Sequence, residues 1–173
     1  MNYDYSKAIE IAEGVYWIGY NVEQGWFRTN PYLIIEGDEA AIIDPGSVID
    51  FDKVYKKLTS VCPIKKLKYV ILHHQDPDLC SSTVELEKKT DLFLYMPIRS
   101  TLFLKYYGIK SFATPIEKDG QFLEFKTGRK LKFFMALTAM RLELWLHMMR
   151  KTKYYLQATF LEHLTESGNF MLT

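Results

Sequence analysis

The strongest constraint on the fold is an alternation of two kinds of segment along the first 134 residues of this 173-residue chain. Short runs rich in β-branched and aromatic residues, typical of strands, alternate with stretches whose apolar residues recur at helical spacing. Turn-forming residues separate them at short intervals. The alternation predicts an α/β or α+β domain in which helices pack on a sheet, and the length fits one domain.

The chain is expected to open with an antiparallel meander. Strands are predicted at Val15 to Tyr20, Tyr32 to Ile35 and Ala40 to Ile43, and the turn Glu36-Gly37-Asp38-Glu39 joins the last two into a hairpin. The next segment predicts an amphipathic helix, because its apolar residues follow a 3.6-residue period. These residues are Val48, Phe51, Val54, Tyr55 and Leu58.

The most informative segment is a short apolar strand, predicted at Lys68 to Leu72, that leads into a polar loop and then into a helix at Ser81 to Lys89. Side chains at alternate positions of an extended loop point to one side, so His74, Asp76 and Asp78 could together bind a metal ion. An ordinary turn in which Asp78 or Ser81 caps the following helix explains the same residues without a metal. Spacing alone does not decide between the two.

Composition excludes several classes of function. Lys and Arg number 22 against 21 Asp and Glu, a net charge of +1, so no basic stripe for nucleic acid is expected. Apolar runs such as Ala40 to Ile43 are far shorter than the roughly 20 residues that cross a bilayer, and no membrane partner is expected. Without a signal-peptide pattern, and with only Cys62 and Cys80, the expectation is a cytoplasmic protein with reduced thiols.

Three segments of the chain resemble one known family. They are residues 29–35 (Thr-Asn-Pro-Tyr-Leu-Ile-Ile), 41–46 (Ala-Ile-Ile-Asp-Pro-Gly) and 70–82 (Val-Ile-Leu-His-His-Gln-Asp-Pro-Asp-Leu-Cys-Ser-Ser). They look like the metallo-β-lactamase fold of flavodiiron proteins, and in particular the branch without a flavodoxin domain, the oxygen-binding diiron proteins. The resemblance implies an αββα sandwich, incomplete at its carboxyl end, in a single partial domain over residues 1–173.

The family motif His-x-Glu-x-Asp-His implies the ligands by position. It puts His74 and Asp76 on one iron and Asp78 on the other, and it has histidine where this chain has Leu79. The resemblance implies two iron ions, with zinc or manganese as alternatives; oxygen ligands in place of imidazole favour iron or manganese over zinc. It also implies dioxygen or nitric oxide as the bound molecule and an external flavin or rubredoxin-type electron donor, and it leaves a homodimer open.

Residues around the motif have competing interpretations. Asp44 resembles a carboxylate that orients a ligand imidazole, or it opens a turn before Pro45-Gly46. Cys80 is either a thiolate stabilised at a helix N-terminus or, as we expect, a small buried residue. His147 and His163 are isolated and are not expected to bind metal.

The resemblance covers Ile9 to Phe134 and then ends. The family's next segments, His-Ala-Pro-Gly and Ser-x-Asp, are absent as written. Codons for Leu137 to Met149 can nonetheless be chosen so that the neighbouring frame reads His-Ala-Pro-Gly, and those for Lys153 to Leu164 so that it reads Ser-Ser-Asp. We therefore hypothesise that residues 135–164 are an out-of-frame translation. As written, Met135 to Arg150 is compatible with an amphipathic helix of poor periodicity.

We expect from these features a diiron protein that binds or reduces oxygen or nitric oxide, an oxidoreductase, impaired in this chain. A zinc-dependent hydrolase on the same fold and a non-catalytic, pseudogene-like remnant are the alternatives. Three protein ligands are too few for two ions. The chain as written is therefore expected to hold at most one weakly bound ion, on His74 and Asp76.

Overall fold

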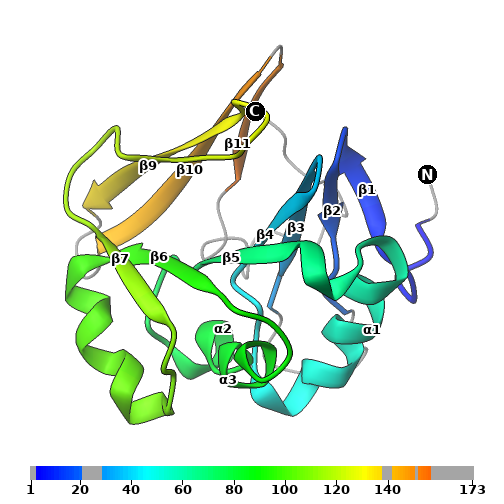
Figure 1. Ribbon diagram of the computed structural model, residues 1–173, viewed down its shortest axis with the longest axis horizontal. Helices are drawn as coiled ribbons and strands as arrows, with labels where there is room; N and C mark the ends of the chain where they lie inside the picture. Colours follow the sequence, from blue (N-terminus) through cyan, green and yellow to red (C-terminus); the bar gives the residue numbers. More distant parts are fainter. Residues whose placement is uncertain (1–2, 21–28, 138–141, 151, 157–173) are drawn as a thin grey trace.

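The computed structural model describes residues 3–20, 29–137, 142–150 and 152–156. Its elements form two sheets and a layer of helices (Figure 1). Sheet A has seven strands in the order β1 to β7, and sheet B has four in the order β11-β10-β9-β8. The strands are Ile9–Ala12 (β1), Val15–Trp17 (β2), Tyr32–Glu36 (β3), Glu39–Ile43 (β4), Leu67–Ile71 (β5), Phe93–Pro97 (β6), Phe112–Ile116 (β7), Phe122–Glu124 (β8), Lys130–Leu137 (β9), Leu142–Arg150 (β10) and Thr152–Leu156 (β11). The helices are Val48–Asp50 (η1), Phe51–Val61 (α1), Ile64–Lys66 (η2), Pro77–Cys80 (α2), Thr83–Glu87 (α3) and Ile98–Tyr107 (η3).

Sheet A changes direction halfway across. Strands β1 to β4 run antiparallel, and β4 to β7 run parallel. The predicted meander and the hairpin at residues 36–39 are therefore confirmed, with Glu36 paired to Glu39 in the β3–β4 register. Because β4, β5 and β6 are parallel, the loops that follow them leave at one edge of the sheet, where open α/β sheets bind ligands.

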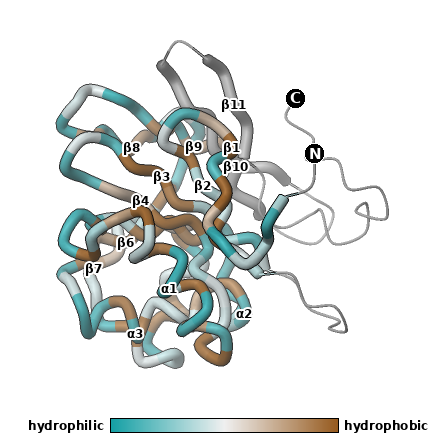
Figure 2. The backbone as a smooth tube through the Cα atoms, turned by 90° about the vertical axis from the view of Figure 1, so that its right-hand side faces the viewer, coloured by the Kyte–Doolittle hydropathy of each residue, from teal (hydrophilic) through white to brown (hydrophobic). Residues whose placement is uncertain are grey.

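Sheet A is buried on both faces, and consecutive residues of a strand serve different faces. On β4, Ile42 packs into the apolar cluster beneath the helices, whereas Ile43 belongs to the cluster between the two sheets. Val70 and Ile71 of β5 divide in the same way. Burying each such side chain stabilises the fold by roughly 1.5–3 kcal/mol. Figure 2 shows apolar residues along the central strands β3 and β4 and hydrophilic residues at surface turns.

The predicted helix after the meander is confirmed as α1. Its residues Phe51, Val54 and Leu58 are buried against sheet A. The predicted helix at residues 81–89 is confirmed as the shorter helix α3, and a separate short helix, α2, comes before it. Strand β7 was not predicted, because Pro115 lies inside it and proline is tolerated only at a sheet edge, the position that β7 occupies.

Sheet B begins with an antiparallel hairpin of β8 and β9 and continues beyond it. Strand β10 pairs antiparallel with both β9 and β11, with Trp145 opposite Phe134. The prediction of a helix over residues 135–150 is therefore wrong. Neighbouring strands on both sides satisfy the backbone hydrogen bonds of β10, and the weak helical period of this segment does not favour a helix over this pairing. Within the described ranges, the helices lie on sheet A and sheet B covers its other face (Figure 1), so they build three layers of an αββα sandwich. No described helix has the length and apolar character of a membrane span.

Candidate metal centre

The loop that carries the predicted ligands lies where the sequence places it, at the carboxyl end of β5. Two backbone hydrogen bonds continue the sheet to its start: Asp44 N–H donates to the Ile71 carbonyl, and Leu72 N–H donates to the Tyr95 carbonyl, both at 2.9 Å. The loop ends at Pro77, the first residue of α2, where the missing N–H and fixed φ of proline suit a helix start.

His74 and Asp76 come together within this loop. Nδ1 of His74 lies 3.1 Å from Oδ1 of Asp76. The two atoms lack hydrogen-bond alignment, and no described residue forms a hydrogen bond with this buried nitrogen. Asp76 stands at the N-cap of α2, yet its side chain makes no capping hydrogen bond. Ser81, one of the two predicted caps, instead accepts the Val48 N–H and donates to the Pro77 carbonyl through its hydroxyl. The His74–Asp76 pair offers one imidazole nitrogen and one carboxylate to a cation.

Asp78 is near these residues but is not part of the same group. Burial raises the pKa of its carboxyl, and the negative charges of Asp76 and Asp44 raise it further, against the opposing effects of its own backbone N–H and of His74. In the described part of the chain, no three His, Cys, Asp or Glu side chains stand close enough to hold one ion. Among the described residues, the His74–Asp76 pair could give a cation two donors, and no complete ligand set is present. The ligand roles of His74, Asp76 and Asp78 stay predictions.

Asp44 contacts an imidazole, but that of His73 rather than His74. Its Oδ1 accepts the backbone N–H of His73 at 2.9 Å, and its Oδ2 lies 2.8 Å from Nδ1 of the same residue. Both side chains are about 1% exposed. Sequence reasoning did not single out His73, because a histidine beside a ligand histidine carries no spacing signal of its own.

Cys80 is a buried thiol, as expected. It is 1% exposed, and its Sγ donates to the Gln75 carbonyl at 3.3 Å. Burial raises its pKa to about 12, with further contributions from the negative charges of Asp44, Asp78 and Asp76. The thiolate interpretation is therefore wrong. His147 lies on β10, opposite Lys132 and Tyr155, and His163 lies outside the described residues.

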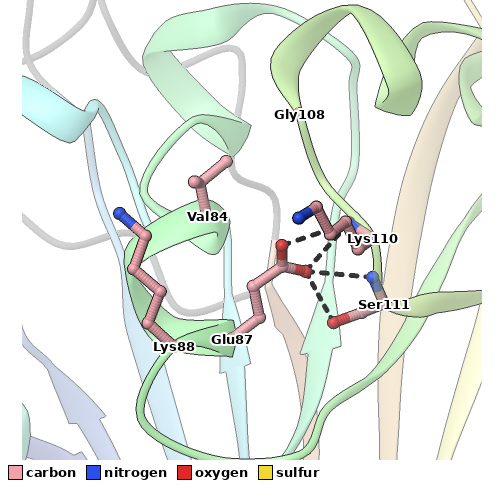
Figure 3. A pocket seen from close by; sticks show the side chains of 6 residues that line it. All are labelled: Val84, Glu87, Lys88, Gly108, Lys110 and Ser111. Carbon is pink, nitrogen blue, oxygen red and sulfur yellow. Dashed lines mark hydrogen bonds between the residues drawn. The ribbon is translucent and has the colours of Figure 1, made fainter.

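A surface pocket of about 410 Å³ lies at the other end of the parallel strands, beside the residues that precede β7 (Figure 3). The Glu87 carboxylate on its wall accepts the N–H of Lys110 at 3.0 Å, and the N–H and hydroxyl of Ser111 at 2.9 and 2.8 Å. These bonds use most of its accepting capacity. Glu87 therefore anchors the turn before β7 to α3.

The two facing sheets, the outer helices and the polar loop after β5 define the fold as that of the metallo-β-lactamases. The family described as "ODP family beta lactamase" matches residues 27–159, which is most of the chain. The chain belongs to this family. Curated protein sequences gave no match.

Solved structures agree with this fold. A flavodiiron protein from Giardia intestinalis superposes with a TM-score of 0.71 at 21% identity, over 85% of this chain and 39% of that one. A chemotaxis sensor ODP, described as a peroxy diiron species, gives 0.62 at 20% identity, over 80% and 57%. MEM-A1, a subclass B3 metallo-β-lactamase from a soil metagenome library, gives 0.69 at 10% identity, over 88% and 63%. The chain thus spans less than two thirds of each of these structures.

Proposed function

We propose that this chain derives from an iron protein that binds dioxygen or nitric oxide, and that in its present form it holds one metal ion. The observation that carries the proposal is the buried His74 nitrogen 3.1 Å from the Asp76 carboxylate, at the carboxyl edge of the sheet of a protein from the ODP family. Two solved structures that share the fold are described as diiron proteins, which supports iron as the metal.

Ligand chemistry supports iron over zinc. The proposed site has one imidazole from His74 and one carboxylate from Asp76, and by resemblance Asp78 gives a carboxylate to the second metal position. Zinc hydrolases favour nitrogen and sulfur donors, whereas oxygen-rich sets suit harder ions such as iron and manganese. An iron site of this kind needs electrons from outside the chain, and we propose a flavin or rubredoxin-type donor in the cytoplasm. A homodimer is compatible with the proposal.

The out-of-frame hypothesis for residues 135–164 explains why the ligand set is short. The family's His-Ala-Pro-Gly and Ser-x-Asp segments are absent, and each ligand replaced by water gives up preorganised geometry. We propose that residues 1–173 form a single metallo-β-lactamase domain whose second metal position is incomplete, with an oxygen chemistry that is impaired accordingly.

The test is anaerobic loading of the purified chain with ferrous, manganous or zinc ions, followed by metal analysis and exposure to oxygen or nitric oxide. We expect one weakly held ion per chain, preference for iron, and no stable oxygen product. Zinc preference with turnover of lactam or thioester substrates would instead establish the hydrolase. Absence of binding for all three ions would establish the non-catalytic remnant and overturn the proposal.

A further inference from the structure

The turn that follows β4 forms hydrogen bonds with the residues before and after the candidate metal loop. Before the loop, Asp44 bonds Ile71 through its backbone N–H and His73 through its carboxylate. After the loop, Gly46 N–H donates to the Leu79 carbonyl at 3.0 Å, and the Gly46 carbonyl accepts the Ser82 N–H at 3.0 Å. The turn at residues 44–47 therefore brackets the segment that contains His74, Asp76 and Asp78.

Asp44 adopts a backbone conformation that is uncommon for residues other than glycine, although aspartate reaches it more readily than most. Its φ is +44°, and it is the one non-glycine residue with positive φ in the described ranges. Strain of this kind persists where surrounding interactions impose it, and it concentrates at functional sites. Here those interactions are the two contacts to His73 and the bond to Ile71, all of them buried.

The two ring nitrogens of His73 lie in different environments. Because a carboxylate accepts hydrogen bonds, the nitrogen that faces Asp44, Nδ1, is the one that carries a hydrogen and donates it. Nε2 is buried, and within the described part of the chain no group forms a hydrogen bond with it. An imidazole held in this way can be either a metal ligand through Nε2 or a device that fixes the backbone through Nδ1.

We propose that His73 is a positioning residue: its Nδ1 contact with Asp44 fixes the peptide before His74, and so presets the metal loop. The His73–Asp44 pair and the His74–Asp76 pair are separate, and no third ligand-type side chain joins either pair in the described part of the chain. The geometry therefore assigns the function to Nδ1. The effect of this contact on metal affinity rests on the function proposed above, whereas its effect on loop order does not.

Substituting His73 by asparagine or by glutamine distinguishes the role of Nδ1 from the role of Nε2. The amide N–H of His73→Asn can occupy the place of Nδ1, and the longer side chain of His73→Gln extends toward the place of Nε2. We expect His73→Asn to keep both the wild-type hydrogen-exchange rate of residues 72–80 in the metal-free protein and a zinc affinity within about threefold. His73→Gln and His73→Ala are expected to raise that exchange rate and to lower zinc affinity about 10- to 100-fold.

Two further variants make the test specific. Asp44→Asn keeps one acceptor oxygen for the His73 backbone N–H and loses the acceptor that faces Nδ1, so it should match His73→Ala, and the double variant should be no worse. Leu94→Ala, in the buried core of β6, should speed exchange across sheet A without changing zinc affinity. If His73→Gln kept the wild-type zinc affinity and His73→Asn lost it, Nε2 would be the functional atom and the proposal would be overturned. Unchanged hydrogen exchange of residues 72–80 in all variants would overturn it as well. Failure of the wild-type chain to bind any metal would refute the proposed function, and the exchange result alone would then decide the role of His73.

Discussion

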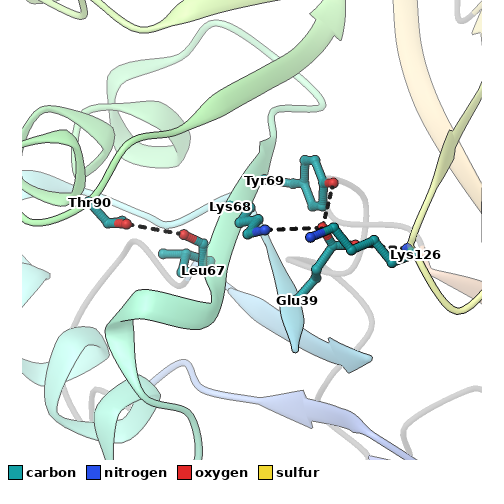
Figure 4. A network of polar contacts seen from close by, with 6 residues as sticks. All are labelled: Glu39, Leu67, Lys68, Tyr69, Thr90 and Lys126. Atoms are coloured by element: carbon teal, nitrogen blue, oxygen red, sulfur yellow. Dashed lines mark hydrogen bonds and ion pairs between the residues drawn. The ribbon is translucent and has the colours of Figure 1, made fainter. Parts of the chain in front are cut away.

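The carboxylate of Glu39 accepts the backbone N–H of Lys126 at 2.8 Å and thereby ties β4 of sheet A to the turn between β8 and β9 (Figure 4). Its other oxygen accepts Tyr69 OH at 3.2 Å and Lys68 Nζ at 3.3 Å. The side chain is 3% exposed. Burial alone would raise the pKa of Glu39, but the bonds from Lys126, Lys68 and Tyr69 outweigh it and hold the pKa below its usual 4.5. This buried carboxylate thus couples the two sheets.

Replacing Glu39 by Gln should lower the free energy of unfolding by about 1–3 kcal/mol, because charge-assisted hydrogen bonds are lost at a buried position. A carboxyl whose folded-state pKa is depressed stabilises the fold above its unfolded-state pKa, and that stabilisation is lost as pH falls through the folded-state value. The difference in free energy of unfolding between wild type and Glu39→Gln should therefore be largest at pH 7 and should shrink below about pH 4.5.

Urea unfolding at several pH values checks this prediction. Glu124→Gln is the matched control, because Glu124 pairs with Lys130 at 3.1 Å on the surface, where ion pairs contribute about 0–1 kcal/mol. Equal losses of unfolding free energy in the two variants would contradict the role of Glu39 in coupling the sheets. A Glu39→Gln effect that grows in acid would contradict it as well.

Metal affinity should depend on His74 and Asp76 and much less on Asp78. Since the first two lie 3.1 Å apart and Asp78 is outside their group, His74→Ala and Asp76→Asn should each weaken ferrous binding at least tenfold, about 1.4 kcal/mol, with a smaller effect of Asp78→Asn. Anaerobic titration measures all three. Asp91→Asn, on the exposed turn before β6, serves as the control. An Asp78→Asn effect as large as that of His74→Ala would mean that three ligands converge.

Gly46 is required both for its backbone conformation and for space. Its φ is +89°, and a Cβ there would lie 3.1 Å from Oγ1 of Thr29. Gly120 has φ +82° with open space around it, so Gly120→Ala isolates the conformational cost. We expect about 1–2 kcal/mol of destabilisation for the conformation in either variant, and more for Gly46→Ala because of the added contact. Denaturation midpoints measure the stability of both variants. Equal losses of stability would show that the Thr29 side chain moves aside freely.

Much of sheet A could be predicted, because local patterns and long-range packing agree there. The β3–β4 hairpin has a turn sequence between two apolar runs, and α1 has a clear helical period. The loop after β5 was placed correctly because a buried apolar strand ends abruptly in polar residues. Strand β7 was missed because Pro115 contradicts a strand locally and only its edge position permits it.

The candidate site was predictable in its residue types and less so in its contacts. The motif picked out His74 and Asp76, which the fold brings together. It gave no means of telling that Asp44 would bind His73 rather than the neighbouring histidine, because that choice depends on the positive φ of Asp44 and on the register between β4 and β5. Both are properties of the packed sheet, which no single segment encodes.

The last prediction concerns residues 135–164. If they are an out-of-frame translation, a chain with the neighbouring frame restored gains the His-Ala-Pro-Gly and Ser-x-Asp segments, which by resemblance supply the missing ligands. Such a chain should bind two iron ions and react with oxygen, because each added protein ligand replaces water with preorganised geometry. His74→Ala in the restored chain should abolish both properties. Metal analysis and oxygen uptake, measured beside the gene sequence, check the prediction. Two irons bound by the chain as written would contradict it, and His147 or His163 would then be the first residues to substitute in search of the remaining ligands.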